Sequence, residues 1–469
     1  MPAVSTGPLS SPGPLSSAGQ LSELAVAGPS RTGLTVSLLG TLFVMVLLAT
    51  ALVPWSALTN AITSAADPGL DFTDGEIAQA RGLRDPLRVL AVLGAVVSLV
   101  VALLLGLTPI GAAIVEGVSF GKGPVIQTVM GVPALLLVGA ALTLPLVVRA
   151  EQQLRAAGLS TRTWGGFASD QLKAFGLQAV LVTAALGGLF WLIRVTPRWW
   201  PFVAAVAAAV LVLVLSALFP LVVEPIFNKF EPLPAGEQRD RLLAVAEEAG
   251  VQVSDVLVAD ASRRTSGLNA YVSGIGPTRR IVVYDTLLDA APPEQVEAVV
   301  AHELGHAARR DVLVGSALGA LGAAAVLLVI GLVLTSGGWD ARAGADGPGD
   351  PRVAGLVLAV VAVATAIAAP ATAAISRQVE ARADEFALQT TADPGAFVAM
   401  QRTLALTNLA DPDPPRWVVW WRGSHPTTAE RMALARQWAV INGKPVPPPS
   451  VTAQAEEAAP GDTDEGVAR

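Results

Sequence analysis

Long runs without charged residues dominate the hydrophobic pattern of the chain. Seven of them reach about 20 residues, the length that an α-helix needs to cross the hydrocarbon core of a bilayer. The runs lie near residues 33–53, 89–109, 125–148, 174–193, 199–223, 312–335 and 353–376. The pattern therefore predicts a mainly α-helical integral-membrane protein with seven spans.

Two stretches outside these runs have a mixed, more polar character. Charged residues return at 224–312, where short β-branched segments alternate with turn residues. The pattern predicts a helix at 239–249, strands at 256–259, 269–273 and 280–284, and a second helix that begins at Pro292 and Pro293 and runs through His306. Charged helices are expected again at 377–442. We therefore expect one domain with a small β-sheet, assembled from two segments that the hairpin of spans six and seven, 313–376, separates.

The remaining parts are a membrane domain and two tails. The first five spans form the membrane domain, 33–223. Residues 1–32 are rich in Ser, Pro and Gly, and residues 443–469 in Pro, Ala and acidic residues, so both predict disordered tails. Loops on the side of the mixed segments carry one more Lys or Arg than the opposite loops. The positive-inside rule thus favours a cytoplasmic location for these segments.

The composition limits the chemistry that the chain can perform. Of its 469 residues, 52% are hydrophobic and only 15% are charged, as in a membrane protein. The net charge is −7 and no segment is strongly basic, which argues against nucleic acid as a partner. The chain has no cysteine, so any metal ion must bind to His, Asp or Glu. Only three histidines are present.

Two of the three histidines lie in the sequence His302-Glu303-Leu304-Gly305-His306. On a helix, positions i and i+4 share one face, so both imidazoles can reach one zinc ion while Glu303 faces a water on the metal. A catalytic zinc site needs a third protein ligand and leaves the fourth position open. The motif predicts a metal-dependent hydrolytic site.

Two residues are candidates for the third ligand, Glu380 and His425. Glu380 is favoured because the hairpin of spans six and seven returns the chain to the membrane face from which it left the H-E-x-x-H helix. Asp384 follows one helical turn later, where a carboxylate can orient a metal-binding imidazole. Asp311 and Glu385 are interpreted as ordinary solvated side chains.

Three segments together resemble a known family. They are His302–His306, the pattern E-x-x-A-D-x-F-A at Glu380–Ala387, and the sequence P-I-F-N-K-F-E-P-L at 225–233. With the seven spans, they resemble the type I CAAX prenyl endopeptidases over roughly residues 70–435. The resemblance implies an integral-membrane zinc metalloendopeptidase of the gluzincin type. It also implies a seven-helix bundle around a chamber, capped by a zincin-like domain.

The resemblance further implies roles for individual residues. Asn269, Ala270 and Tyr271 match an edge strand that pairs with the substrate backbone by strand addition. His425 and Arg431 match an element whose side chains lie beside the zinc and stabilise the oxyanion. The glutamate of H-E-x-x-H is then the general base. The expected partners are a peptide or membrane-protein substrate and the lipid bilayer.

Two alternatives stay open from the sequence alone. A membrane receptor or scaffold could contain an inert zinc site, although structural sites usually fill all four positions with protein ligands. A transporter would carry ionisable groups within its spans, whereas these spans are nearly free of charge. Arginine far outnumbers lysine, which is typical of a GC-rich bacterial genome. For a bacterial source we expect processing or quality control of membrane proteins.

Overall fold

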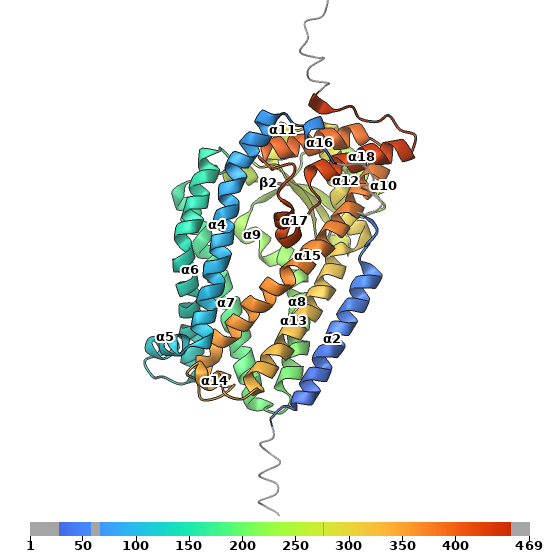
Figure 1. Ribbon diagram of the computed structural model, residues 1–469. Helices are drawn as coiled ribbons and strands as arrows, with labels where there is room; N and C mark the ends of the chain where they lie inside the picture. Colours follow the sequence, from blue (N-terminus) through green and yellow to red (C-terminus); the bar gives the residue numbers. More distant parts are fainter. Residues whose placement is uncertain (1–27, 58–65, 275, 452–469) are drawn as a thin grey trace, which may run out of the picture.

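The computed structural model describes residues 28–57, 66–274 and 276–451. Most of each predicted tail, 1–27 and 452–469, lies outside the described residues. The described chain is mostly helical, with one small sheet gathered near one end of a helical bundle (Figure 1).

Seven helices are long and apolar enough to cross a membrane, which confirms the predicted number of spans. They are α2 (Arg31–Leu52), α4 (Asp74–Leu107), α6 (Pro124–Ala156), α7 (Trp164–Val195), α8 (Trp200–Val222), α13 (Asp311–Thr335) and α15 (Ala354–Thr391). In Figure 1, α2 begins at the lower end of the bundle, whereas the C-terminal helices lie at the upper end. This arrangement agrees with an odd number of crossings.

The spans expose much of their apolar surface. Val36, Phe43 and Ile367, for example, are more than half exposed on α2 and α15. Such surface is unfavourable in water and favourable against lipid tails, so a bilayer accounts for it. Between spans, α13 packs against α8 and α2, and α15 packs against α4.

Four spans, α4, α6, α7 and α15, continue beyond the length that the sequence predicted, and α4 and α15 extend furthest. Helix α4 begins at Asp74, where the Thr73 hydroxyl and the Glu76 carboxylate form a capping box. Helix α15 runs without a break from the seventh span through Thr391. The boundary expected at residue 377 therefore lies inside one helix, and the motif at Glu380–Ala387 extends a membrane span.

The sheet has four strands in the order β1-β2-β4-β3. The strands are β1 (Phe230–Pro232), β2 (Asp255–Ala259), β3 (Ala270–Ser273) and β4 (Arg280–Tyr284). β2 and β4 are parallel, and the other two pairs are antiparallel. Three strands were predicted, whereas β1 was not; it is three residues long and ends in a proline. β3 lies at one edge, with Tyr271 opposite Val282.

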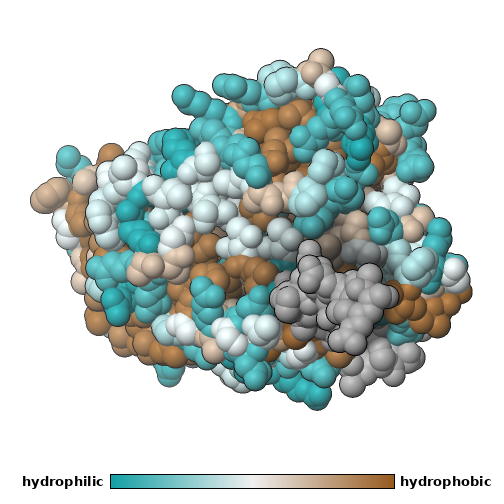
Figure 2. All heavy atoms as spheres, turned by 90° about the horizontal axis from the view of Figure 1, so that it is seen from above, coloured by the Kyte–Doolittle hydropathy of each residue, from teal (hydrophilic) through white to brown (hydrophobic). Residues whose placement is uncertain are grey.

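The polar segments pack around one apolar core. Their helices are α10 (Glu237–Glu248), α11 (Asp285–Ala290), α12 (Pro293–Arg309), α16 (Pro394–Thr407), α17 (Arg416–Arg422) and α18 (Thr428–Ile441). The sheet contributes Ile281 and Val283 to this core, α12 contributes Leu304, and α16 and α18 contribute Phe397 and Met432. Both polar segments thus form one unit. Figure 2 shows it from above, with hydrophilic side chains over much of this end and hydrophobic ones along the lower left rim.

Short elements complete the described chain. They are η1 (Pro68–Leu70), α5 (Ile110–Ser119), α9 (Glu224–Phe227), η2 (Ala261–Arg263), η3 (Gly276–Thr278), α14 (Trp339–Arg342) and η4 (Pro351–Val353). Helix α5 lies at the end of the bundle opposite the sheet (Figure 1).

Candidate active site

Helix α12 presents the H-E-x-x-H motif between the apolar core and α15. Val296, Val300 and Leu304 are fully buried against the core. This apolar face fixes the rotation of the helix, so His302 and His306 turn to the neighbouring face. Their ring centroids lie 4.9 Å apart, as expected for an i, i+4 pair.

Helix α15 brings Glu380 to the two histidines. One carboxylate oxygen lies 3.2 Å from His302 Nε2 and the other 3.7 Å from His306 Nε2. Gly305 permits this approach, because a Cβ there would lie 3.1 Å from the ring of Phe386 on α15. The three side chains offer ligand atoms within 4.8 Å of one another. The hairpin of spans six and seven therefore does bring the two motifs together.

The donor set suits a metal ion. Oε2 of Glu380 is buried and accepts no well-aligned hydrogen bond among the described residues, although Nε2 of His302 lies 3.2 Å away and Nε2 of His425 3.1 Å away. A buried carboxylate oxygen without a well-aligned partner is costly, and a cation would remove this cost. Two imidazole nitrogens and one carboxylate oxygen also match the ligands of catalytic zinc sites. His302, His306 and Glu380 would therefore supply the three protein ligands that a catalytic zinc ion needs.

Behind His302 lies a deeply buried pair. The Nδ1 atom of His302 is 2.8 Å from Asp384, whose side chain is fully buried. Arg431 on α18 donates to both oxygens of Asp384, at 2.8 and 2.5 Å. In the amide orientation that satisfies hydrogen bonding, Gln401 also accepts from Arg431. A carboxylate at Nδ1 leaves Nε2 of His302 directed at Glu380 and available to a metal.

His306 has a second carboxylate behind it, which sequence reasoning missed. Its Nδ1 atom lies 2.9 Å from Asp311, which also accepts from Arg382. Arg310, between α12 and α13, has φ of +58°, and this left-handed residue turns the chain at the junction of the two helices. Asp311 had been interpreted as solvated because an acidic residue at the start of a helix is common. Its role depends on a turn that the sequence pattern does not show.

The electrostatic surroundings affect two groups of the motif. Burial raises the pKa of Glu303, and the nearby His302 and His306 offset this only in part. Burial by itself would lower the pKa of His302, but the contacts with Asp384 and Glu380 outweigh it and raise the value to about 10. A metal ion at His302 would therefore have to compete with a proton.

His425 reaches the same cluster from the loop between α17 and α18. Its Nε2 lies 3.1 Å from Oε2 of Glu380, and Ser424 contacts its Nδ1 at 2.8 Å. Arg377, one turn before Glu380, donates to the carbonyl groups of Val419 and Gly423 and holds this loop against α15. The side chain of His425 is half exposed, at 53%, whereas His302 is buried.

Arg431 and the edge strand complete the predicted set. The Nε and Nη2 atoms of Arg431 are bound to Asp384, on the far side of His302 from Glu380. Asn269, Ala270 and Tyr271 lie at and just before the start of β3, which is an edge strand as predicted.

Comparisons with known proteins agree with this architecture. The family described as peptidase family M48 matches residues 232–439, and the CAAX prenyl protease N-terminal family with five membrane helices matches residues 87–229. An uncharacterized metalloprotease, YhfN of Bacillus subtilis, is 31% identical over 315 residues, which are 66% of this chain and 74% of the relative. The chain belongs to peptidase family M48.

Other relatives and one solved structure extend this result. The CAAX prenyl protease 1 homolog of Caenorhabditis elegans is 26% identical over 61% of this chain and 71% of its own length. The corresponding Arabidopsis thaliana protein is 33% identical over 32% of this chain and 35% of its own. The crystal structure of S. mikatae Ste24p matches with a TM-score of 0.67, at 19% identity, over 87% of this chain and all of that one.

These findings confirm the resemblance that the sequence motifs indicated. The chain is a multi-pass integral-membrane metalloendopeptidase, and its fold is that of Ste24p. Membership in the family implies a metal ion, typically zinc, and a peptide substrate. The receptor, scaffold and transporter alternatives are thereby set aside. The roles of single residues and the chamber remain predictions.

Proposed function

We propose that this metalloendopeptidase binds one zinc ion through His302, His306 and Glu380. The observation that carries the proposal is that the two imidazoles and the Glu380 carboxylate offer three ligand atoms within 4.8 Å of one another. A zinc ion held by three protein ligands supplies a Lewis acid and lowers the pKa of bound water. Asp384 and Asp311 hold the two imidazoles by their Nδ1 atoms.

In the proposed hydrolysis, Glu303 and His425 have different roles. Glu303 takes a proton from the attacking water and later gives it to the leaving amine nitrogen. A raised pKa suits this double role, because the carboxyl group must both accept and release the proton. His425, half exposed beside Glu380, donates a hydrogen bond to the oxyanion that forms when the water oxygen bonds to the carbonyl carbon and that collapses when the C–N bond breaks.

Arg431 was predicted to stabilise the oxyanion, but most of its guanidinium group is already engaged by Asp384. Two of its nitrogen atoms bind Asp384, so Nη1 is the remaining donor that could face a substrate. We propose that Arg431 acts mainly by holding Asp384 against His302. The substrate backbone would pair with the free edge of β3 along Asn269, Ala270 and Tyr271.

The substrate class follows from the place of the site. The motif of α15 directly continues a membrane span, so the zinc ion would lie within a few helical turns of the bilayer surface. We propose that the unit formed by the two polar segments, here called the catalytic unit, is cytoplasmic and that the protein processes membrane or misfolded proteins. Because the chain has no cysteine, single cysteines at Lys444 and Lys122 would report the side of each end by labelling.

Glu303→Gln tests the catalytic assignment. Purified protein in detergent would be assayed with fluorescein-labelled casein, and then with a quenched peptide copied from the fastest cleavage site. Loss of a general base should reduce hydrolysis by about 10²- to 10⁴-fold and leave bound zinc nearly unchanged. Glu294→Gln, an exposed position on the same helix, is the matched control. Full activity in Glu303→Gln would refute the proposal.

A second pair of variants separates Glu380 from His425. Glu380→Ala should lose zinc and activity together, since the carboxylate is a ligand. His425→Ala should keep zinc and lose kcat by about 10²- to 10³-fold, as for an oxyanion donor. Metal stoichiometry measured by mass spectrometry decides between them. Zinc lost from His425→Ala but kept in Glu380→Ala would reverse the two roles.

A further inference from the structure

The side chain of Asn408 forms two hydrogen bonds with the backbone of Leu268, as a residue of a paired strand would. Its Oδ1 accepts from the N–H of Leu268 at 2.9 Å, and its Nδ2 donates to the carbonyl oxygen of the same residue at 3.3 Å. The two residues are 140 positions apart. An amide side chain can replace a backbone pair in this way because it carries one donor group and one acceptor.

Leu268 comes directly before Asn269–Tyr271, the segment that is predicted to pair with the substrate. Leu268 is buried, and its successor Asn269 accepts from the backbone N–H of Tyr284 at 3.0 Å, next to the first pair of the β3–β4 ladder. On the other side, the hydroxyl of Thr265 bonds to the carbonyl oxygen of Leu159 at 2.9 Å. The segment that enters β3 is thus fixed at one point by the membrane domain and at another by Asn408.

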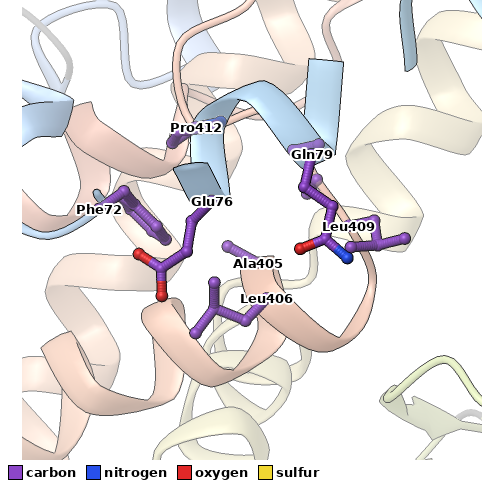
Figure 3. Close-up of a pocket in the computed structure, with 9 residues that line it drawn as sticks. Phe72, Glu76, Gln79, Ala405, Leu406, Leu409 and Pro412 are labelled. Carbon is purple, nitrogen blue, oxygen red and sulfur yellow. The ribbon is translucent and has the colours of Figure 1, made fainter. Parts of the chain in front are cut away.

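Helix α4 in turn holds the loop that carries Asn408. Arg84 donates to the carbonyl oxygen of Asn408 and, at 2.8 Å, to that of Leu409. Arg88 binds the buried Asp411 at 2.7 Å, and Arg81 binds it at 3.4 Å. Figure 3 shows α4 passing over this segment, with Gln79 beside Leu409. The second membrane span, α4, is therefore connected by hydrogen bonds and ion pairs to the loop after α16, and Asn408 of this loop contacts the residue before β3.

We propose that Asn408 is a positioning residue for substrate binding, which sets the place of Asn269–Tyr271 relative to the metal site. This inference rests on the proposed function, in which the substrate adds to β3 as a strand. Strand addition depends on the alignment of the edge backbone, because each hydrogen bond weakens steeply when its geometry is poor. Asn408 touches neither the metal ligands nor the reacting atoms, so it should affect binding of substrate more than the chemical step.

The surroundings of Asn408 indicate that its removal would not unfold the protein. A cavity of about 450 Å³ lies beside it, lined by residues that include Arg84, Thr265 and Gly267. Water entering from this cavity could solvate the N–H and carbonyl groups of Leu268 in a truncated variant. The expected defect is a looser strand, with the core intact.

The test uses Asn408→Ala and Asn408→Asp in the full-length, zinc-loaded protein. The aspartate keeps the acceptor for Leu268 N–H but places a carboxylate oxygen where the donor faced the Leu268 carbonyl oxygen, so it tests the donor separately. Asn442→Ala is the matched control, since Asn442 is exposed and bonds to Trp438 in its own helix. Kinetics with the quenched peptide would be measured together with amide hydrogen exchange of residues 268–273.

For Asn408→Ala we expect KM to rise about 3- to 10-fold, the effect of losing roughly one hydrogen bond, with kcat within about twofold of wild type. Exchange at 268–273 should become faster, while exchange at 255–259 and zinc content stay unchanged. Unchanged exchange at 268–273 would overturn the positioning role. Faster exchange with an unchanged KM would show that this strand does not bind substrate.

The exchange measurement needs no substrate, so it also separates this inference from the proposed function. A wild-type protein whose hydrolysis does not depend on Glu303 would refute the proposed function. The exchange of 268–273 would in that case still decide whether Asn408 fixes the strand. A fall in kcat with an unchanged KM would instead assign Asn408 to the chemical step and contradict a positioning role in binding.

Discussion

The regions behind His302 and behind His306 use the same chemistry in different settings. Each places a carboxylate at Nδ1 and an arginine on that carboxylate. Behind His302 the side chains of Asp384 and Arg431 are 0% and 13% exposed, and they belong to α15 and α18. Behind His306 those of Asp311 and Arg382 are 7% and 22% exposed.

The difference lies in what each pair can do without its partner. A charge in the interior that loses its counter-charge stays uncompensated, whereas a charge near the surface can be solvated. His302 is thus held by the core of the catalytic unit. His306 is held by the first residue of a membrane span, at a place that is somewhat more exposed. The two histidines should respond unequally to equivalent changes.

The largest effect is expected for Asp384→Ala. This change leaves Arg431 buried without its carboxylate and removes the acceptor at Nδ1 of His302. Breaking a buried pair from one side costs about 3–5 kcal/mol, so we expect lower stability and loss of zinc. Thermal unfolding and metal content in detergent would measure both. Asp384→Asn keeps the shape of the side chain and one acceptor, so its effect on stability and zinc content should be smaller. If Asp384→Ala kept its zinc and its stability, the proposed difference between the surroundings of His302 and His306 would be refuted.

Asp311→Ala should have an intermediate effect. His306 loses its acceptor, but Arg382 is more exposed than Arg431, at 22% against 13%. Loss of such a support typically lowers metal affinity by about 10- to 100-fold, with less effect on folding than at Asp384. Zinc affinity would be measured by competition with a chelator, with the exposed Asp289→Ala as control. A larger loss of stability here than in Asp384→Ala would invert the comparison.

A third pair, without a histidine, should have the smallest effect on the metal site. Asp71 binds Arg436 at 2.7 and 2.6 Å and accepts from Ser450. Burial alone would raise the pKa of Asp71, but Arg436 and Ser450 outweigh it and lower the value below the usual 3.8. Asp71→Asn should cost about 1.5–3 kcal/mol at neutral pH, the range for hydrogen bonds to charged groups.

The sign of the pH dependence at Asp71 follows from the lowered pKa. The ionised carboxylate stabilises the folded state fully above the unfolded pKa near 3.8, and this contribution is lost as the pH falls through the lower folded value. The stability difference between wild type and Asp71→Asn should therefore shrink only in acid. Thermal unfolding at neutral and acidic pH measures this, with the exposed Asp413→Asn as control. A constant difference throughout would contradict it.

Local patterns predicted much of this fold. Charge-free runs are sufficient to find spans, and the i, i+4 spacing of His302 and His306 is a property of any helix. Glu380 was found by topology, because a hairpin returns the chain to the face that it left. The structure places all three residues together.

Contacts between distant segments were not predictable in the same way. Asp311 reaches His306 only because the chain turns at Arg310, which is not a glycine and gives no signal of a left-handed backbone. The clamp of Asn408 on Leu268 depends on the packing of two loops far apart in sequence. A single asparagine in a loop resembles any other turn residue until both loops are placed.

Helix α15 carries Glu380 as a rigid continuation of the seventh span, whereas α12 joins the sixth span at Arg310. A zinc ion bound as proposed to His306 and Glu380 would close a ring of chain that includes both membrane helices. Because the ion would bind the folded arrangement and not the unfolded chain, it would stabilise the packing of these two helices by mass action. Metal removal would thus abolish catalysis and also lower the resistance of the two spans to being pulled apart.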